Sequence, residues 1–233
     1  KDDWATASAQ SWRLAGIDGP EIVAERGDFA QRFADASRRV ETTYQYAFVS
    51  HAQLEPQVCV ARPTAEGGYE LWPPSQTPQR AQKNVANTLK IDESKVTIHP
   101  VRVGGGFGRR LYTDFVAEAA QVCKVTGLPI QLIWSREEEV AQGAYRPQSS
   151  AALKASLTKE KRITAYRNDY AQPESAESET VFPYTLPAVS RRHFAHVSNQ
   201  QTGAWRSVNS TQQGFYNESF MDELAHAAGE DPV

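Results

Sequence analysis

The sequence predicts an α+β fold in which mixed or antiparallel sheets pack against helices. Two observations favour this class. Short alternating segments rich in β-branched and aromatic residues occur in neighbouring pairs, as they do in hairpins. Helical segments fall between them at irregular intervals, whereas a doubly wound parallel sheet would alternate strand and helix regularly. A chain of 233 residues has room for one or two domains.

Eight segments carry the strand pattern. In chain order they are 40–46, 58–62, 69–72, 95–103, 130–134, 151–157, 163–170 and 192–197. Gly67 and Gly68 predict a hairpin turn between the second and third segments, and residues 159–161 predict one between the sixth and seventh. Residues 174–187 are rich in Ser, Glu and Pro and are expected to form a loop.

Four segments carry the helical pattern. They are 29–37, 79–89, 113–125 and 211–228. Asp28 is expected to cap the first helix, and Thr77 with Pro78 to begin the second. Gly127 and Gly229 are expected to end the last two, because glycine readily takes the left-handed conformation at a helix C-terminus.

The composition excludes several classes of protein. The formal net charge is −3 and Lys and Arg form no dense stripe, so binding to nucleic acid is not expected. No apolar run approaches the roughly 20 residues that are needed to span a bilayer. Cys59 and Cys123 lie far apart and outside any C-x-x-C motif. We therefore expect two buried free thiols and no zinc or iron–sulfur site on this chain.

The most distinctive local feature is Gly104-Gly105-Gly106-Phe107-Gly108, which two arginines follow. It lies between a predicted strand and a predicted helix. Glycines allow positive φ and a close approach to a ligand, and successive N–H groups near a helix start can bind an anion. The segment matches neither the Walker A loop nor the dinucleotide fingerprint. A ligand-binding loop and a simple tight turn are both compatible with it.

Six other short motifs accompany this loop. In chain order they are H-A-Q-L-E-P (51–56), W-P-P-S-Q-T-P (72–78), W-S-R-E-E (134–138), Y-R-P (145–147), G-A-W-R-S (203–207) and E-S-F-M-D-E-L-A (218–225). Each alone is more often a turn or a cap. Together and in this order they resemble the molybdenum-binding subunit of the xanthine dehydrogenase/aldehyde oxidase family, in particular the branch that contains the isoquinoline 1-oxidoreductase beta subunit. The resemblance covers residues from about 27 to 233.

The resemblance implies a fold, an activity and a cofactor. Residues 38–233 would be the first part of the molybdopterin-binding domain, and residues 1–37 the tail of a preceding domain. The family oxidises an aldehyde or an N-heterocycle and takes the oxygen from water. Molybdenum is held by the dithiolene of molybdopterin, expected here in the cytosine dinucleotide form, so no side chain would be a metal ligand. The protein places the cofactor and tunes its electrostatics.

The same resemblance implies roles for particular residues. Gln76 matches a glutamine that donates a hydrogen bond to an oxo ligand of molybdenum; a neutral amide suits that role, and a helix-start cap is the alternative. Phe107 and Arg206 match positions whose backbone amides face the metal. Arg146 matches a substrate-contacting position of purine-oxidising members, and a surface strand arginine is the alternative. Further cofactor contacts are expected at Gly104, Gly105, Gly106, Gly108 and Trp205.

The sequence also departs from the family. Leu111 stands where purine-oxidising relatives carry a substrate-binding glutamate, so purine recognition is not expected. The general-base glutamate belongs to a Gly-Glu-Pro segment that this chain lacks. His51 and Glu55 lie in a family motif, but the sequence assigns them no function; a polar lock inside the protein is one interpretation.

The missing motifs and the chain ends suggest a piece of a longer enzyme. The chain begins at Lys1 and stops at Asp231-Pro232-Val233, where a proline would open a further segment. We expect it to be inactive alone and to work with the rest of the large subunit, a small subunit carrying [2Fe–2S] clusters and, optionally, a cytochrome c. A bacterial, periplasmic or membrane-associated location is expected. The alternatives are a stand-alone anion- or nucleotide-binding module and a purely structural module.

Overall fold

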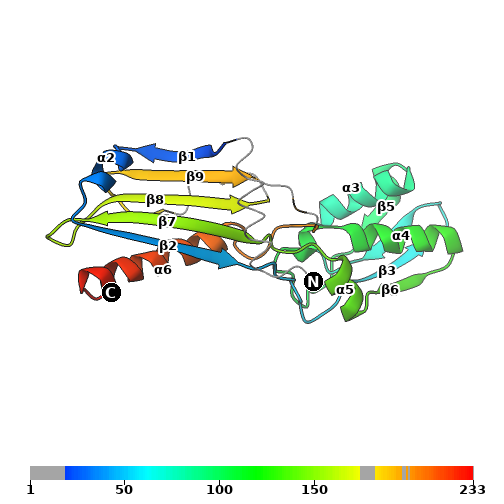
Figure 1. The fold of residues 1–233 in the computed structure, drawn as a ribbon. Coiled ribbons are helices and arrows are strands. Elements are labelled where there is room, and N and C mark those ends of the chain that lie inside the picture. The colour runs from blue at the N-terminus through cyan, green and yellow to red at the C-terminus, as the bar shows by residue number, and fades with distance from the viewer. Residues whose placement is uncertain (1–18, 174–181, 196–197, 199, 233) are drawn as a thin grey trace. The chain divides into compact units, whose positions relative to one another are not determined.

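The computed structural model describes residues 19–173, 182–195, 198 and 200–232 (Figure 1). The chain divides into two compact units. One is built from residues 1–49, 147–202 and 207–233, and we call it the five-stranded unit. The other is built from residues 50–146 and 203–206, and we call it the four-stranded unit.

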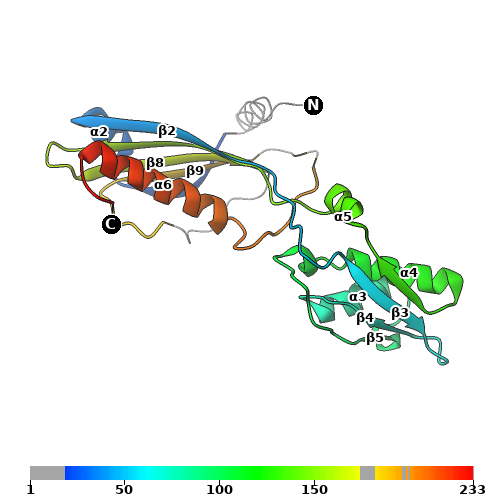
Figure 2. The ribbon, with the colours of Figure 1, turned by 90° about the horizontal axis from the view of Figure 1, so that it is seen from below.

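The five-stranded unit is a mixed sheet with helices packed against it. Its strands are β1 (Glu21–Arg26), β2 (Arg38–Tyr46), β7 (Ser149–Leu157), β8 (Ile163–Gln172) and β9 (Val189–Ala195). Their order is β1-β9-β8-β7-β2, with β8 and β9 parallel and the other neighbours antiparallel. Helix α6 (Ser210–Ala228) lies along the sheet (Figure 2), and the short α2 (Phe29–Ala34) contacts β8.

Strand β8 buries different partners on its two faces because successive side chains of a strand point to opposite sides. Tyr166 packs against Phe220 of α6, and its hydroxyl donates to Asn217 Oδ1 at 2.6 Å. The next residue, Arg167, places its guanidinium 4.1 Å from the ring centre of Phe29 in α2. The alternation along β8 therefore separates a core under α6 from a smaller one under α2.

The four-stranded unit carries most of the motifs found in the sequence. Its strands are β3 (Val58–Pro63), β4 (Tyr69–Trp72), β5 (Val96–Ile98) and β6 (Ile130–Ile133), in the order β5-β4-β3-β6. Strands β4 and β5 are parallel and the other neighbours are antiparallel. Its helices are α3 (Pro78–Leu89), α4 (Asp114–Thr126) and α5 (Arg136–Gln142), with 3₁₀ turns at Glu93–Lys95 and Arg109–Leu111. The strands and helices α3 and α4 share one apolar core that includes Leu71, Val85 and Phe115.

The predicted α+β class with mixed sheets is confirmed. Both predicted hairpins form, and Asp28 caps α2 by accepting a hydrogen bond from the backbone N–H of Gln31. Gly127 and Gly229 end α4 and α6 with positive φ. Both cysteines are free and buried. In the described part of the chain, no helix combines the length and the apolar character that crossing a bilayer requires.

Three local predictions need correction. The strand predicted over 95–103 ends at Ile98, because only residues 96–98 pair with β4. Thr77 precedes α3 but makes no side-chain cap; its hydroxyl donates to Leu111 O at 3.1 Å instead. Helix α2 ends at Ala34, earlier than expected. Residues 174–181 of the predicted loop and 196–197 of the last predicted strand lie outside the described residues.

Two elements are not predicted by the sequence pattern. Strand β1 pairs along one side only, with β9, and most of its residues are exposed, so it lacks a buried alternation. Helix α5 is seven residues long, which is too short for helical periodicity. Its start does carry a recognisable signal, since Ser135 accepts from the backbone N–H of Glu138 at 3.1 Å in an S-x-x-E pattern.

Candidate functional site

The glycine loop, residues 104–108, is a strained turn within the four-stranded unit. It follows residues without regular structure and precedes the 3₁₀ turn Arg109–Leu111, so neither the predicted strand nor the predicted α-helix touches it directly. Gly105 and Gly108 have φ of +100° and +102°, and Phe107, at +53°, also has positive φ. Gly106 does not. Positive φ is unusual outside glycine, and it marks Phe107 as held in place by its surroundings.

The first and last glycine amides of the loop are bound within the protein. Gly104 N–H donates to Glu55 Oε2 at 3.0 Å, and Gly108 N–H donates to Gln76 Oε1 at 3.1 Å. These two amides are therefore engaged within the protein.

The middle of the loop presents three consecutive amides. In the described part of the chain, the N–H groups of Gly105, Gly106 and Phe107 have no hydrogen-bond acceptor. Gln76 lies beside them, exposed, with its carbonyl oxygen turned to Gly108 and its Nε2 amide without an acceptor among the described residues. Three backbone donors and one side-chain donor together suit a negatively charged or oxygen-rich group.

The glycines are required by space as well as by φ. A Cβ on Gly106 would lie 2.5 Å from Gln76 Oε1, and a Cβ on Gly108 would lie 2.1 Å from the carbonyl oxygen of Ala204. A Cβ on Gly104 would lie 2.5 Å from Cβ of Glu55. Each substitution would thus press on a different neighbour of the loop.

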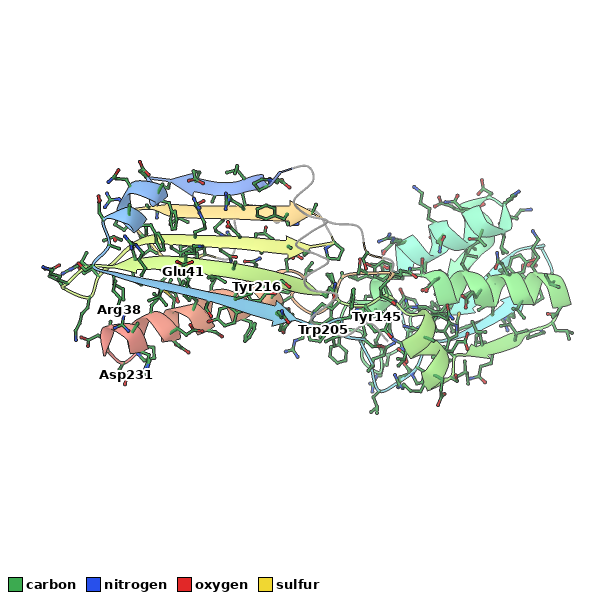
Figure 3. The ribbon with its side chains drawn as sticks, viewed as in Figure 1. Arg38, Glu41, Tyr145, Trp205, Tyr216 and Asp231 are labelled. Atoms are coloured by element: carbon green, nitrogen blue, oxygen red, sulfur yellow. The ribbon has the colours of Figure 1, made fainter. Side chains whose placement is uncertain are left out.

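Residues 203–206 return from the distant part of the sequence and lie beside this loop. Gly203 N–H donates to Tyr145 O at 2.8 Å, and Ala204 N–H donates to Tyr112 Oη at 2.9 Å. Tyr145 and Trp205 of this region are labelled in Figure 3. Ala204 O lies 2.8 Å from Nε2 of His51. Residues 203–206 of the motif G-A-W-R-S are therefore part of the four-stranded unit.

Arg146 and Trp205 form a stacked pair. The Arg146 guanidinium lies 5.4 Å from the centre of the Trp205 ring, within the range of a cation–π contact. Arg146 is 4% exposed, so the interpretation as a surface strand arginine is wrong. The indole Nε1 of Trp205 is buried and has no acceptor in the described part of the chain. Arg206, next in the sequence, is exposed.

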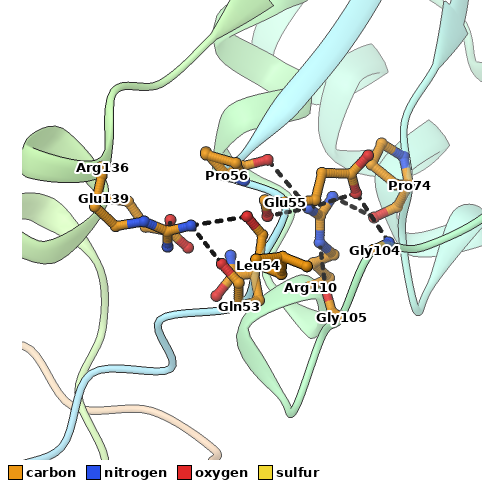
Figure 4. Close-up of polar contacts among 10 residues, drawn as sticks. All are labelled: Gln53, Leu54, Glu55, Pro56, Pro74, Gly104, Gly105, Arg110, Arg136 and Glu139. Carbon is orange, nitrogen blue, oxygen red and sulfur yellow. Dashed lines mark hydrogen bonds and ion pairs between the residues drawn. The ribbon is translucent and has the colours of Figure 1, made fainter.

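Arg110 is a central residue to which sequence reasoning assigned no role. Its side chain is completely buried and donates to four carbonyl oxygens at 2.8–3.1 Å, and it pairs with Glu55 Oε2 at 2.8 Å (Figure 4). The four carbonyls belong to Gly105, Pro74, Glu55 and Pro56. Three separate loops therefore converge on one guanidinium. Burial lowers the pKa of Arg110, and the Glu55 carboxylate opposes that shift.

Two further arginines, Arg109 and Arg136, make charged contacts next to the glycine loop and Glu55. Arg109 pairs with both carboxylate oxygens of Asp114, at 2.9 and 2.7 Å. Arg136 donates to the carbonyls of Gln53 and Leu54 at 2.6 and 2.9 Å, next to Glu55 (Figure 4). Among the described residues, no group of three or more His, Cys, Asp or Glu side chains could hold a metal ion.

Comparison with known proteins identifies relatives that match most of the chain. Residues 17–233 match the family model described as "Molybdopterin cofactor-binding domain". The chain is 28% identical over 245 aligned residues to the beta subunit of isoquinoline 1-oxidoreductase from Brevundimonas diminuta, covering 97% of this chain and 30% of the relative. It is 29% identical to the large molybdopterin subunit of nicotinate dehydrogenase from Eubacterium barkeri, with coverage of 90% and 52%. The chain thus spans about a third of the length of the first relative and about half of the second.

Solved structures show the same fold. The aldehyde oxidoreductase from Desulfovibrio gigas superposes with a TM-score of 0.78 at 21% identity, covering 92% of this chain and 25% of that one. Quinoline 2-oxidoreductase from Pseudomonas putida 86 gives a TM-score of 0.76 at 23% identity, with coverage of 91% and 30%.

Proposed function

On the premise that this chain belongs to the family of molybdopterin cofactor-binding domains, we propose that its glycine loop and Gln76 bind the oxygen-rich, metal-bearing end of a molybdenum cofactor. The observation that carries this proposal is the row of three amides at Gly105, Gly106 and Phe107 beside the amide of Gln76. The parent protein is then a hydroxylase that oxidises an aldehyde or an N-heterocycle. The two relatives described above are named for the oxidation of N-heterocycles.

The residues present fit this cofactor. A group bearing oxygens needs hydrogen-bond donors without competing positive charge, and backbone and carboxamide N–H groups meet that need. The cofactor also needs room against the backbone. A Cβ at Gly106 would fill the space next to Gln76 Oε1, so glycine keeps that space open. When bound, the cofactor supplies a two-electron oxidation in which water is the source of oxygen.

The chain's own residues hold the hydrogen-bond donors of the site in place. Gln76 is held by two contacts, from its backbone N–H to Arg110 O at 3.0 Å and from Gly108 N–H to its own Oε1. Its Nε2 therefore has a defined direction and donates to an oxygen atom of the cofactor. A donor aimed in advance needs no reorganisation as charge changes during turnover. We infer that the stacked pair of Arg146 and Trp205 forms a wall on the substrate side of the site, and that Trp205 and Arg206 contact the cofactor as their motif implies.

The finer features of the enzyme are also proposals. We infer the cytosine dinucleotide form of the cofactor, and a general-base glutamate in the part of the large subunit that lies outside this chain. We also infer a small partner subunit with [2Fe–2S] clusters, since the first relative is named as a beta subunit, with a cytochrome c as an optional further acceptor. A bacterial periplasmic or membrane-associated location is part of the same proposal.

The decisive experiment compares the isolated chain with the full-length parent. The parent is expected to release molybdenum and a pterin nucleotide on denaturation, and the isolated 233-residue chain is expected to carry little molybdenum and to show no turnover. Stoichiometric molybdenum with turnover in the isolated chain would contradict this. Tight binding of inorganic phosphate or ATP by the isolated chain would instead support a stand-alone anion-binding module, since the three loop amides are donors for any anion.

A further inference from the structure

The motif H-A-Q-L-E-P at residues 51–56 has no part in the proposed function so far, yet the side chains of His51 and Glu55 contact residues 203–206 and the glycine loop. His51 is 7% exposed, with Nδ1 3.0 Å from Ala144 O and Nε2 2.8 Å from Ala204 O. The two carbonyls lie 93 and 153 residues further along the chain. One imidazole therefore connects two segments that the sequence holds far apart.

The Ala204 carbonyl is also the atom against which the glycine loop packs. A Cβ on Gly108 would lie 2.1 Å from this oxygen, so the loop backbone approaches it as closely as a glycine permits. The His51 ring and the glycine loop thus contact the same carbonyl oxygen. The position of the ring therefore limits how closely residues 203–206 approach the loop. The Ala204 amide is held separately by Tyr112 Oη at 2.9 Å.

Glu55, four residues after His51, holds the other end of the loop. Its Oε2 accepts from Gly104 N–H at 3.0 Å and pairs with Arg110 at 2.8 Å, while its backbone N–H donates to Gly104 O at 3.1 Å (Figure 4). Both backbone groups of Gly104, its N–H and its carbonyl oxygen, are thus hydrogen-bonded to Glu55. Arg136, through the carbonyls of Gln53 and Leu54, keeps the chain between His51 and Glu55 in place.

We propose that His51 and Glu55 are the positioning pair of the site: His51 sets the place of residues 203–206, and Glu55 sets the place of the loop 104–108. One rigid segment then fixes the separation between the wall that carries Trp205 and the three free amides of the loop. Its catalytic consequence rests on the proposed function, whereas the positioning itself does not.

The protonation state of His51 decides whether one or both of its carbonyl contacts are hydrogen bonds. A neutral imidazole has one N–H and donates to one carbonyl at a time, whereas an imidazolium donates to both. Burial lowers the pKa of His51, the two carbonyl contacts oppose that shift, and the Arg109 guanidinium adds to it. The neutral ring therefore has a single N–H donor, which lies on Nε2 and donates to Ala204 O, the shorter of the two contacts.

Hydrogen exchange in the full-length protein, without loaded cofactor, tests the His51 half. In His51→Leu, exchange of the hydrogen-bonded amides of Gly203 and Ala204 is expected to rise by roughly two- to tenfold, the effect of losing one hydrogen bond. His51→Gln places an amide nitrogen near the Nε2 position and restores protection; His51→Asn places it near the Nδ1 position and does not. His99→Gln, in the same unit but bonded to Glu70, is the control and leaves 203–206 unchanged.

The Glu55 half is tested in the same way. Glu55→Ala removes the acceptor of the Gly104 amide and speeds exchange of that amide by a similar factor, while residues 203–206 stay protected. Glu55→Gln keeps an acceptor oxygen and is expected to retain much of the protection. Equal rises in both segments for every variant would mean general destabilisation and would overturn the proposal. So would wild-type exchange in His51→Leu, or a full rescue by His51→Asn.

Kinetics of the loaded enzyme separate this inference from the proposed function. In His51→Gln and Glu55→Gln, which keep a hydrogen-bonding group, kcat is expected to stay near wild type. In His51→Leu it is expected to fall by about ten- to a hundredfold with little change in KM, since misplacement affects the reacting centre and spares substrate binding. If exchange responds as expected but kcat does not, the positioning stands and the cofactor assignment fails. If neither responds, the positioning pair is refuted.

Discussion

Gly106 and Gly108 lie two residues apart in one loop, and alanine is expected to fail at these two positions for different reasons. At Gly106, an added Cβ would lie 2.5 Å from Oε1 of Gln76. Gln76 is exposed, so its side chain can move aside, and the fold loses mainly the hydrogen bond from Gly108 N–H to that oxygen. One such bond contributes about 0.5–1.5 kcal/mol.

At Gly108, the added Cβ would lie 2.1 Å from the Ala204 carbonyl oxygen, and φ is +102°. This oxygen is backbone, so no side-chain rotation relieves the contact. Positive φ costs a non-glycine residue about 1–2 kcal/mol, and overpacking a filled site costs about 1–3 kcal/mol more. Together they lower the free energy of unfolding by roughly 2–5 kcal/mol.

The assay is chemical denaturation beside molybdenum content, with both variants made in the full-length protein. Gly106→Ala is expected to keep a denaturation midpoint near that of wild type but to lose molybdenum, because the displaced Gln76 and the new methyl group occupy the cofactor's place. Gly108→Ala is expected to shift the midpoint strongly. Equal losses of stability in the two variants would refute the geometric reasoning. Normal molybdenum and turnover in Gly106→Ala would refute the assignment of the loop to the cofactor.

The remaining predictions concern catalysis, acid stability and thiol reactivity. Gln76→Ala is expected to keep molybdenum but to slow the chemical step by about 100- to 1,000-fold, as for loss of one preorganised donor, measured as single-turnover reduction of the iron–sulfur centres; an unchanged rate would contradict its role. Burial lowers the pKa of His193, and the Glu21 carboxylate, whose Oε2 lies 3.6 Å from Nδ1, opposes this shift. Because the folded pKa lies below the unfolded value of about 6.5, the unfolded state binds more protons between the two values. The contribution of His193 to the free energy of unfolding is therefore fully present above about pH 6.5 and is lost as the pH drops. In urea titrations, His193→Gln is expected to make the free energy of unfolding depend less steeply on pH. Burial raises the pKa of Cys59 to about 12 and also raises that of Cys123, so a thiol reagent at neutral pH should label neither until the protein is unfolded; rapid labelling of the native protein would count against the burial.

Most regular elements could be predicted because their signals are local. Asp28, Gly127 and Gly229 mark helix ends through their own backbone and side-chain preferences. The strand predicted over 95–103 failed for the opposite reason. Its alternation continues past Ile98, but the paired register stops at Leu71 and β4 ends at Trp72, so the pairing fades to a long contact of 3.5 Å from Val101 N–H to Pro73 O.

The candidate site divides in the same way. Gln76 and the glycines could be found as letters in ordered motifs, and the structure adds that the outer two loop amides are occupied and the inner three are not. Arg110 was visible as the second arginine after the loop, but nothing in its sequence surroundings indicates burial. Its environment is made by carbonyls 5 to 55 residues away, and a charged side chain is buried only when such partners meet it in space.

The sequence by itself determined the α+β class, the order of the motifs and the family they indicate, since all three depend on residues read in chain order. Only the tertiary structure decided that Arg146 is buried against Trp205, that His51 reaches Ala204, and that Glu55 holds Gly104. These contacts join residues 49 to 153 positions apart. A local pattern carries no information about them, because hydrogen bonds and burial depend on which segments folding brings within about 3 Å of each other.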